Sequence, residues 1–176
     1  MSRQDMKQAG NKLAEIFIDS LEFARGERHM SGVIPVRSLQ RLADVLANDE
    51  GDLTWVVRGE FVADEFCTRQ RPFLLIEVTG ELYLKCQRCL GALPFHVNVG
   101  SRLLLVPPGM PWPDEDLQDD QADPIEALIE QPLFPLIEDE ILLALPISPR
   151  HASCTLPEHD DGKAAASPFA ALARLK

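Results

Sequence analysis

Two cysteines three positions apart, Cys86 and Cys89, stand in the stretch LKCQRCL between two apolar runs. Thiolates at this spacing can hold a metal ion, exchange with a disulfide, or simply occupy a hairpin turn. A structural zinc site needs four ligands, usually sulfurs or imidazole nitrogens. The chain offers a second pair at the same spacing, with His159 as a possible substitute for its histidine. We therefore predict a possible structural zinc site formed by Cys86, Cys89, His151 and Cys154.

Two alternative interpretations use the same residues. In the first, Cys86 and Cys89 are uncoordinated thiols of a turn, and the downstream histidine and cysteine are unrelated surface residues. In the second, the pair is a redox motif. A thioredoxin-like pair depends on a helix N-terminus to lower the pKa of its attacking thiol, whereas here the motif precedes a strand-like run. The redox interpretation is therefore the weakest of the three.

No other group of residues forms a convincing catalytic set. His29 and His96 have no serine or cysteine at a recognisable catalytic spacing. The consecutive carboxylates at 138–140 fit an acidic helix N-terminus better than a divalent-metal patch. The glycines are scattered and form no phosphate-binding loop. We expect a protein that is not an enzyme.

The charge is distributed unevenly along the chain. The formal net charge is −11, which by itself argues against a nucleic-acid partner. However, residues 111–146 contain 11 Asp+Glu and no Lys or Arg, whereas residues 1–110 contain 14 and 13. Prolines and carboxylates at 111–131 predict an acidic, mobile loop. This loop would be a solubilising insertion, or an arm that docks on a basic protein or competes with RNA.

The elements that must position the cysteines are mainly strands. Apolar residues alternate in the runs 53–65, 72–86 and 93–106, which predicts three antiparallel strands with one apolar face. Asp19 is a plausible N-cap for a short helix that ends near Gly26. The predicted fold class is α+β: an antiparallel β meander packed with a few short helices.

Three further helices are expected. The stripe at positions 39, 42, 43 and 46 predicts a helix within 34–48. The run 134–146 changes to a helical period, with Pro135 in its first turn and Pro146 at its end. Ser167 and Pro168 suit the start of a last short helix.

Length and cysteine content limit the organisation and the compartment. We expect a single domain over residues 1–176, with a loosely ordered segment at 150–166. Four cysteines are too few and too unevenly spaced for a disulfide framework. No run approaches the roughly 18 apolar residues of a membrane span. These features predict a cytoplasmic protein.

Three segments in this order resemble the YceD family, described as large ribosomal RNA subunit accumulation proteins: LKCQRCL at 84–90, IEDEILLALPISP at 137–149 and SPFAALARLK at 167–176. The likeness extends from about Phe17 onward. It implies a non-catalytic factor for synthesis, processing or stability of large-subunit (23S-type) ribosomal RNA in ribosome biogenesis. By this resemblance, Cys86 and Cys89 correspond to the paired cysteines of the family.

The resemblance also directs attention to possible partners, namely large-subunit ribosomal RNA or a basic ribosomal or assembly protein. The alternative is a zinc-stabilised adaptor that binds another protein and acts on RNA only indirectly. For direct contact, exposed basic residues would bind phosphates and a tyrosine would stack on an unpaired base. These candidate RNA-binding residues are Lys85, Arg88, Arg102, Arg69, Arg71 and Tyr83.

Overall fold

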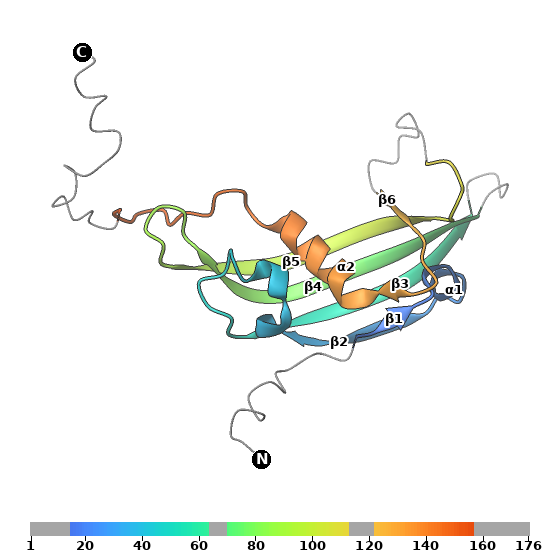
Figure 1. Ribbon diagram of the computed structural model, residues 1–176, viewed down its shortest axis with the longest axis horizontal. Helices are drawn as coiled ribbons and strands as arrows, with labels where there is room; N and C mark the ends of the chain where they lie inside the picture. The colour runs from blue at the N-terminus through green and yellow to red at the C-terminus, as the bar shows by residue number, and fades with distance from the viewer. Residues whose placement is uncertain (1–14, 64–69, 113–121, 157–176) are drawn as a thin grey trace, which may run out of the picture.

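One long sheet organises the protein (Figure 1). The computed structural model describes residues 15–63, 70–112 and 122–156. The strands lie in the order β2 (His29–Pro35), β3 (Asp52–Ala63), β4 (Gln70–Lys85), β5 (Ala92–Val106) and β6 (Asp123–Glu126). The first four form an antiparallel meander, of which the sequence predicts β3, β4 and β5, so the α+β class is confirmed. β6 was not expected, and it runs parallel to β5, which makes the sheet mixed.

The inner face of the sheet carries the core. Trp55 pairs with Val78, and Val78 pairs with Val99, so one row of apolar side chains crosses three strands. All three are buried. Because successive residues of a strand point to opposite faces, their sequence neighbours lie on the other side and are more exposed. The predicted apolar face is therefore the buried one.

Strand β2 was missed because its sequence, HMSGVIP, is interrupted by polar residues and Gly32. A Cβ atom at Gly32 would lie 2.9 Å from Cζ2 of Trp55. The indole ring thus fills the space of the missing side chain, and glycine, which ordinarily weakens a strand, is needed at this point.

Helix α2 (Leu133–Ala144) covers the inner face of the sheet (Figure 1). Leu133, Ile137 and Ile141 follow at intervals of four residues and are fully buried. They form the stripe that turns toward the strands. The predicted helix therefore exists, but it begins before Pro135.

Helix α1 (Ser20–Arg25) lies at one end of the sheet, with Asp19 as its N-cap and Gly26 as its C-cap, as predicted. The Ser20 hydroxyl donates to the carbonyl of Leu128 and accepts from its N–H. The two-residue strands β1 (Phe17–Ile18) and β7 (Gln131–Pro132) pair next to this helix. The strand before α1 and the first residue of α1 thus join this end to the segment that leads into α2.

The predicted helix within 34–48 is wrong. Two 3-10 turns stand there, η1 (Val36–Ser38) and η2 (Gln40–Leu42), separated by Leu39, whose φ of −85° and ψ of 86° are not helical. The buried side chains follow at 36, 39 and 42, a spacing of three that suits a 3-10 turn. The carbonyl of Val45 and the N–H of Ala47 then bond to the backbone of β4 instead of continuing a helix.

The predicted mobile loop at 111–131 also needs correction. Asp123–Glu126 forms strand β6, and Gln131 begins β7. Ala127 is buried and donates its N–H to the carbonyl of Val106. Although its composition is acidic, this stretch therefore packs in part against β5, and these contacts outweigh the disorder that the composition predicts. Residues 113–121 lie outside the described residues.

Some predictions fall on residues that the structure does not describe. The last helix from Ser167, the substitute ligand His159 and the RNA candidate Arg69 are among them. In the described part of the chain, no helix is long and apolar enough to cross a membrane.

Candidate metal centre and nucleic-acid interface

The cysteine pair lies in the turn that joins β4 to β5, which we call the knuckle (residues 86–91). The N–H of Cys86 donates to the carbonyl of Gly91, and the N–H of Leu90 donates to the carbonyl of Cys86. Leu90 has a φ of 62°, the left-handed conformation that closes the turn. These bonds fold the backbone so that both thiols point to one side.

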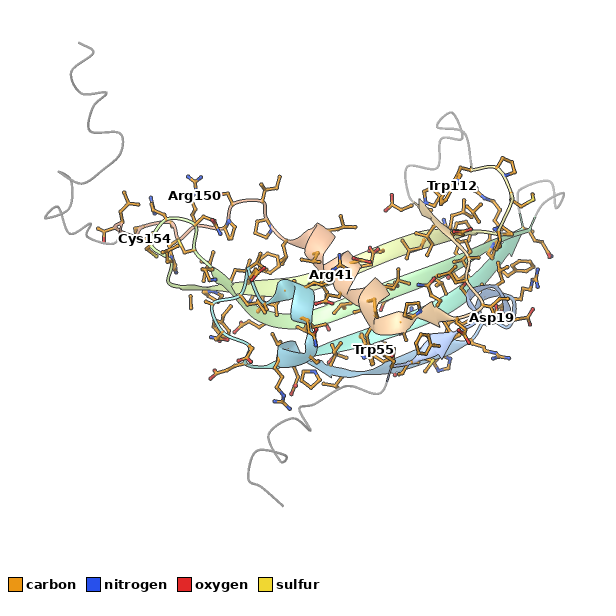
Figure 2. The ribbon with its side chains drawn as sticks, viewed as in Figure 1. Asp19, Arg41, Trp55, Trp112, Arg150 and Cys154 are labelled. Atoms are coloured by element: carbon orange, nitrogen blue, oxygen red, sulfur yellow. The ribbon has the colours of Figure 1, made fainter. Side chains whose placement is uncertain are left out.

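The chain returns to the knuckle after α2 as an irregular segment, the strap (residues 147–156). The N–H of Gln87 donates to the carbonyl of Pro149 at 2.8 Å. One ring nitrogen of His151, Nε2, lies 3.0 Å from the carbonyl oxygen of Ala92. Although 150–166 was expected to be loosely ordered, residues 149–154 make specific contacts with the knuckle. Figure 2 shows Arg150 and Cys154 at this end, opposite Asp19 and Trp112.

The knuckle and the strap bring together all four ligands that spacing predicts. The ligand atoms of Cys86, Cys89, His151 and Cys154 lie within 4.8 Å of one another. The Sγ atoms of Cys86 and Cys154 are 3.9 Å apart, and Cys89 Sγ is 3.4 Å from His151 Nδ1. The alternative in which His151 and Cys154 are surface residues unrelated to Cys86 and Cys89 is therefore wrong, because the two pairs lie side by side.

These separations fit tetrahedral zinc. With Zn–S bonds of 2.3 Å and Zn–N bonds of 2.0–2.1 Å, two sulfurs should be about 3.8 Å apart, and sulfur and nitrogen about 3.6 Å apart. The observed distances are close to both values. The contact with Ala92 also suits a ligand, because Nε2–H donating to a carbonyl leaves Nδ1 deprotonated toward the metal position.

The electrostatics favour a thiolate at Cys86. The backbone N–H of Cys89 bonds to its sulfur and, with the N–H groups of His151 and Arg88, lowers the pKa of Cys86 to about 5 despite burial. For Cys89, the N–H of Gly91 favours the thiolate, but burial and the neighbouring sulfurs of Cys86 and Cys154 raise its pKa. Ionising Cys89 beside these two sulfurs is therefore unfavourable, and a bound metal ion would relieve this.

Arg88, predicted as an RNA contact, is turned toward the cluster. Its Nε donates to the Sγ of Cys154 at 3.0 Å, and another guanidinium nitrogen donates to the carbonyl of His151 at 2.8 Å. The hydrogen bond to Cys154 raises the pKa of Arg88. The guanidinium thus links the knuckle to the strap and offsets thiolate charge. Its spacing from Cys86 and Cys89 gave no sign of this role.

The RNA candidates do not share one surface. Arg71 and Arg102 lie at the α1 end of the sheet, where their guanidinium groups stand 5.6 and 3.9 Å from the ring centre of Phe73. Lys85 lies at the knuckle end and donates to the carbonyl of Asp44. The two groups stand at opposite ends of β4, a strand of 16 residues that spans about 50 Å.

Tyr83 belongs to an acidic neighbourhood. Its hydroxyl hydrogen-bonds to Glu81, and this bond, together with the charges of Glu81 and Glu50, raises its pKa. Carboxylates beside the ring oppose the approach of a phosphate backbone. Tyr83 is therefore a poor stacking platform for RNA in this setting.

The carboxylates of α2 neither cap their own helix nor face a common metal position. They begin at the sixth residue of the helix, so they lie outside its first turn. Oε1 of Glu138 instead accepts from the N–H groups of Arg41 and Leu42, at 2.7 and 3.3 Å. The side chain of Asp139 pairs with that of Arg41. The expected N-terminal acidic turn is wrong, because Glu138 caps η2 and Asp139 pairs with a side chain of η2.

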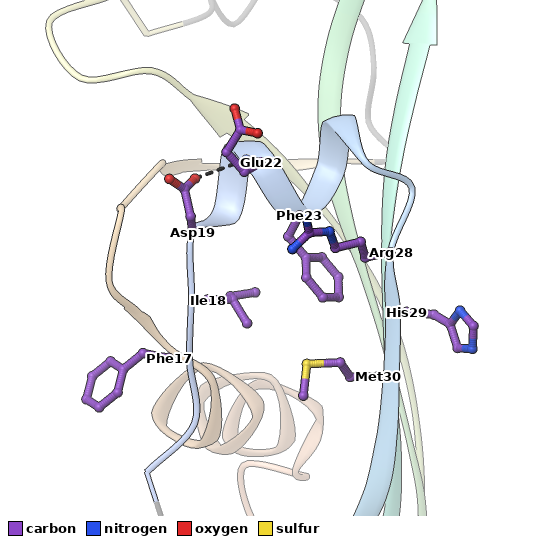
Figure 3. Close-up of a pocket in the computed structure, with 8 residues that line it drawn as sticks. All are labelled: Phe17, Ile18, Asp19, Glu22, Phe23, Arg28, His29 and Met30. Carbon is purple, nitrogen blue, oxygen red and sulfur yellow. Dashed lines mark hydrogen bonds between the residues drawn. The ribbon is translucent and has the colours of Figure 1, made fainter.

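An open groove of about 540 Å³ lies at the other end of the molecule, between β1 and β2 (Figure 3). Ile18, Phe23 and Met30 give it an apolar wall, and His29 points away from them (Figure 3). The carboxylate of Asp19 is already engaged by the N–H of Glu22. This arrangement offers no paired nucleophile and base.

Together these features define an α+β protein whose sheet carries a Cys₃His cluster at a hairpin tip. The chain belongs to the family of the large ribosomal RNA subunit accumulation protein YceD, whose model matches residues 74–176. The match covers more than half of the chain, including all four ligands. The likeness inferred from about Phe17 is thus supported from Leu74 onward. No curated protein and no solved structure matches the chain.

Proposed function

We propose that this protein is a non-catalytic factor for the synthesis, processing or stability of large-subunit ribosomal RNA, with a structural zinc ion in its Cys₃His cluster. The observation that carries the proposal is the convergence of four ligand atoms within 4.8 Å in a member of this family. A site with four protein ligands is closed, which is typical of structural and not of catalytic zinc.

The lack of buried residues in the strap supports a metal. No residue from Leu143 to Leu156 is buried, yet the strap docks on the knuckle. Apolar packing therefore contributes little to its position, and a few hydrogen bonds are individually weak in water. Four metal bonds would supply the missing attraction, as they do in small zinc domains.

The pair of Cys89 and His151 resembles a nucleophile and its base, since their reactive atoms are 3.4 Å apart. Two observations favour the metal ligand role. The pKa of Cys89 is raised, whereas an activated thiol has a lowered one. Moreover, the other two thiols complete the coordination sphere around the same point.

Zinc content and ribosomal RNA levels test the proposal separately. Untagged native protein should carry about one zinc ion per chain. A content below about a tenth of an ion per chain would contradict the zinc site. A strain lacking the gene should show a deficit of large subunits in sedimentation profiles and lower large-subunit RNA relative to small-subunit RNA. Unchanged profiles would contradict the ribosomal function. RNA cleavage by nuclease-free protein would contradict the non-catalytic role.

A further inference from the structure

The knuckle and strap form one end of the molecule, and their sequences share a charge pattern. Residues 82–112 and 141–156 contain no Asp or Glu, although the whole chain has 28. Within the tip, taken as residues 85–92 and 147–156, the basic residues are Lys85, Arg88 and Arg150. Within residues 85–92 and 147–156 the charge is therefore positive on a protein with a net charge of −11, and the nearby carboxylates Glu81 and Glu50 lie beside Tyr83. The knuckle and strap are thus the part best suited to approach a polyanion.

The zinc-loaded cluster and Arg88 together add no net charge to the tip. Zinc with three thiolates and a neutral histidine carries a charge of about −1. Arg88, bonded to Cys154, offsets it. Lys85 and Arg150 therefore remain as the surplus positive charges. Nε of Arg150 donates to the Ser148 hydroxyl, which leaves its terminal nitrogens directed to solvent on an exposed residue.

The tip also exposes large apolar side chains. Ile147 is fully exposed, and Leu90 and Leu156 are 62% and 71% exposed. Leu90 stands in the left-handed position of the turn, where asparagine or glycine would be more favourable. Exposed apolar groups on two segments that dock on each other, one of them kept at a conformational cost, are typical of an interaction surface.

We propose that this tip is the RNA-docking surface of the protein: Lys85 and Arg150 bind phosphates of an unpaired segment of large-subunit ribosomal RNA, while Leu90 and Ile147 contact its bases. The proposal rests on the proposed ribosomal function. Phosphate contacts supply affinity, and splayed bases of loops offer apolar faces. A basic ribosomal protein is the less favoured partner, because residues 85–92 and 147–156 contain no carboxylate to attract it.

The metal has a defined part in this surface. It holds the strap, which carries Ile147 and Arg150, against the knuckle, which carries Leu90 and directly follows Lys85. Without the ion, the two halves of the surface separate, and the affinity for RNA falls even though every contacting side chain is still present. The cluster thus organises binding without touching the RNA.

Filter binding of zinc-loaded full-length protein to protein-free large-subunit ribosomal RNA, across a salt series, tests the proposal. Arg150→Glu should weaken binding about tenfold and reduce the salt slope by about 1. Arg25→Glu at the opposite end makes the same change of charge and should weaken binding less than about twofold. Equal losses for the two variants would overturn the proposal.

Two apolar variants give a second, independent measurement. Ile147→Ser removes no packed contact, because the side chain is fully exposed, and should weaken binding about fivefold. Leu90→Asn keeps the left-handed turn and should do the same. Ile129→Ser, 79% exposed at the α1 end, is the matched control and should bind normally. Normal binding by both tip variants would overturn the base contacts.

The outcomes separate this proposal from the function on which it rests. If the deletion strain has too little large-subunit RNA and expression of the Arg150→Glu variant restores it fully, the proposed docking surface is wrong but the proposed function stands. If the wild-type protein does not bind protein-free RNA and binds only precursor particles, its partner is a protein and the docking proposal fails. If the deletion strain has normal ribosomal RNA, the function fails whatever the binding data show.

Discussion

At the α1 end of the sheet, buried side chains and backbone hydrogen bonds hold the elements together. At the knuckle end, the strap is held by hydrogen bonds and by the contacts among the Cys₃His side chains. Phe23 and Ala24 are buried under the sheet end, and Ser20 bonds to Leu128. The strap has no buried residue. The first end should be stable by packing alone, while the second should depend on its metal. One end can therefore be loosened without the other, which the following predictions exploit.

Loss of one ligand should have the largest effect, and it should be confined to the tip. Cys154→Ser should reduce zinc from about one ion per chain to less than about a tenth, because three ligands no longer close the site. Trypsin should then cleave after Arg150 at least about tenfold faster, since the strap opens locally. Ser153→Ala, next to the ligand, is the control. Retained zinc in Cys154→Ser would contradict the four-ligand site.

Gly59→Ala should break the opposite end. An added Cβ would lie 2.4 Å from the carbonyl oxygen of Phe23, so α1 must move. We expect a loss of about 1–3 kcal/mol in the free energy of unfolding, measured in urea, with unchanged zinc content. Gly100→Ala, where no atom lies within 4 Å of the new Cβ, should cost nothing. A loss of zinc in Gly59→Ala would show that the two ends are coupled.

Glu138→Ala sharpens the comparison, because this residue stands between the two ends. The change leaves the N–H groups of Arg41 and Leu42 without their carboxylate acceptor, and should cost about 1–2 kcal/mol in unfolding free energy. Asp139→Ala removes an exposed ion pair with Arg41 and should cost less than about 1 kcal/mol. Urea denaturation of both variants would reveal the difference, and equal losses would contradict the capping role.

The smallest expected effect is a pH dependence at Glu140. Burial raises the pKa of this carboxyl, against the opposing hydrogen bond from Ser101. A raised folded-state pKa means that the folded protein holds the proton more tightly, so the contribution to stability is present at low pH and is lost as pH rises through that pKa. Glu140→Gln should therefore gain stability relative to wild type between pH 4 and pH 7. A constant difference across this range would refute the effect of burial.

Sequence patterns predicted what depends on local spacing. The N-cap at Asp19 and the apolar alternation of β3, β4 and β5 were identified because each depends only on residues that are close together in the sequence. The four ligands were also found, since two pairs at the same spacing are evident without coordinates. What could not be predicted was their separation in space, because this depends on α2 turning the chain back toward the knuckle.

The failures all involve partners that are distant in sequence. The apolar stripe beginning at Leu39 suggested a helix, but the N–H groups of Arg41 and Leu42 bind a carboxylate 96 or 97 residues later. Strand β2 depends on the indole of Trp55 filling the place of a side chain at Gly32. Arg88 looked like a solvated cation, yet it bonds to Cys154, which is 66 residues away. Composition and periodicity carry no information on such pairs.

The wide separation of the ligands also has a consequence during translation. Cys86 and Cys154 are 68 residues apart, and the meander of β2 to β5 ends at Val106, well before the second pair of ligands. A nascent chain can therefore pair these strands while its metal site is still half built. A product cut short before His151 would keep the meander but could not close the chelate. If the cluster binds zinc as proposed, the ion can be captured only after synthesis has passed the strap.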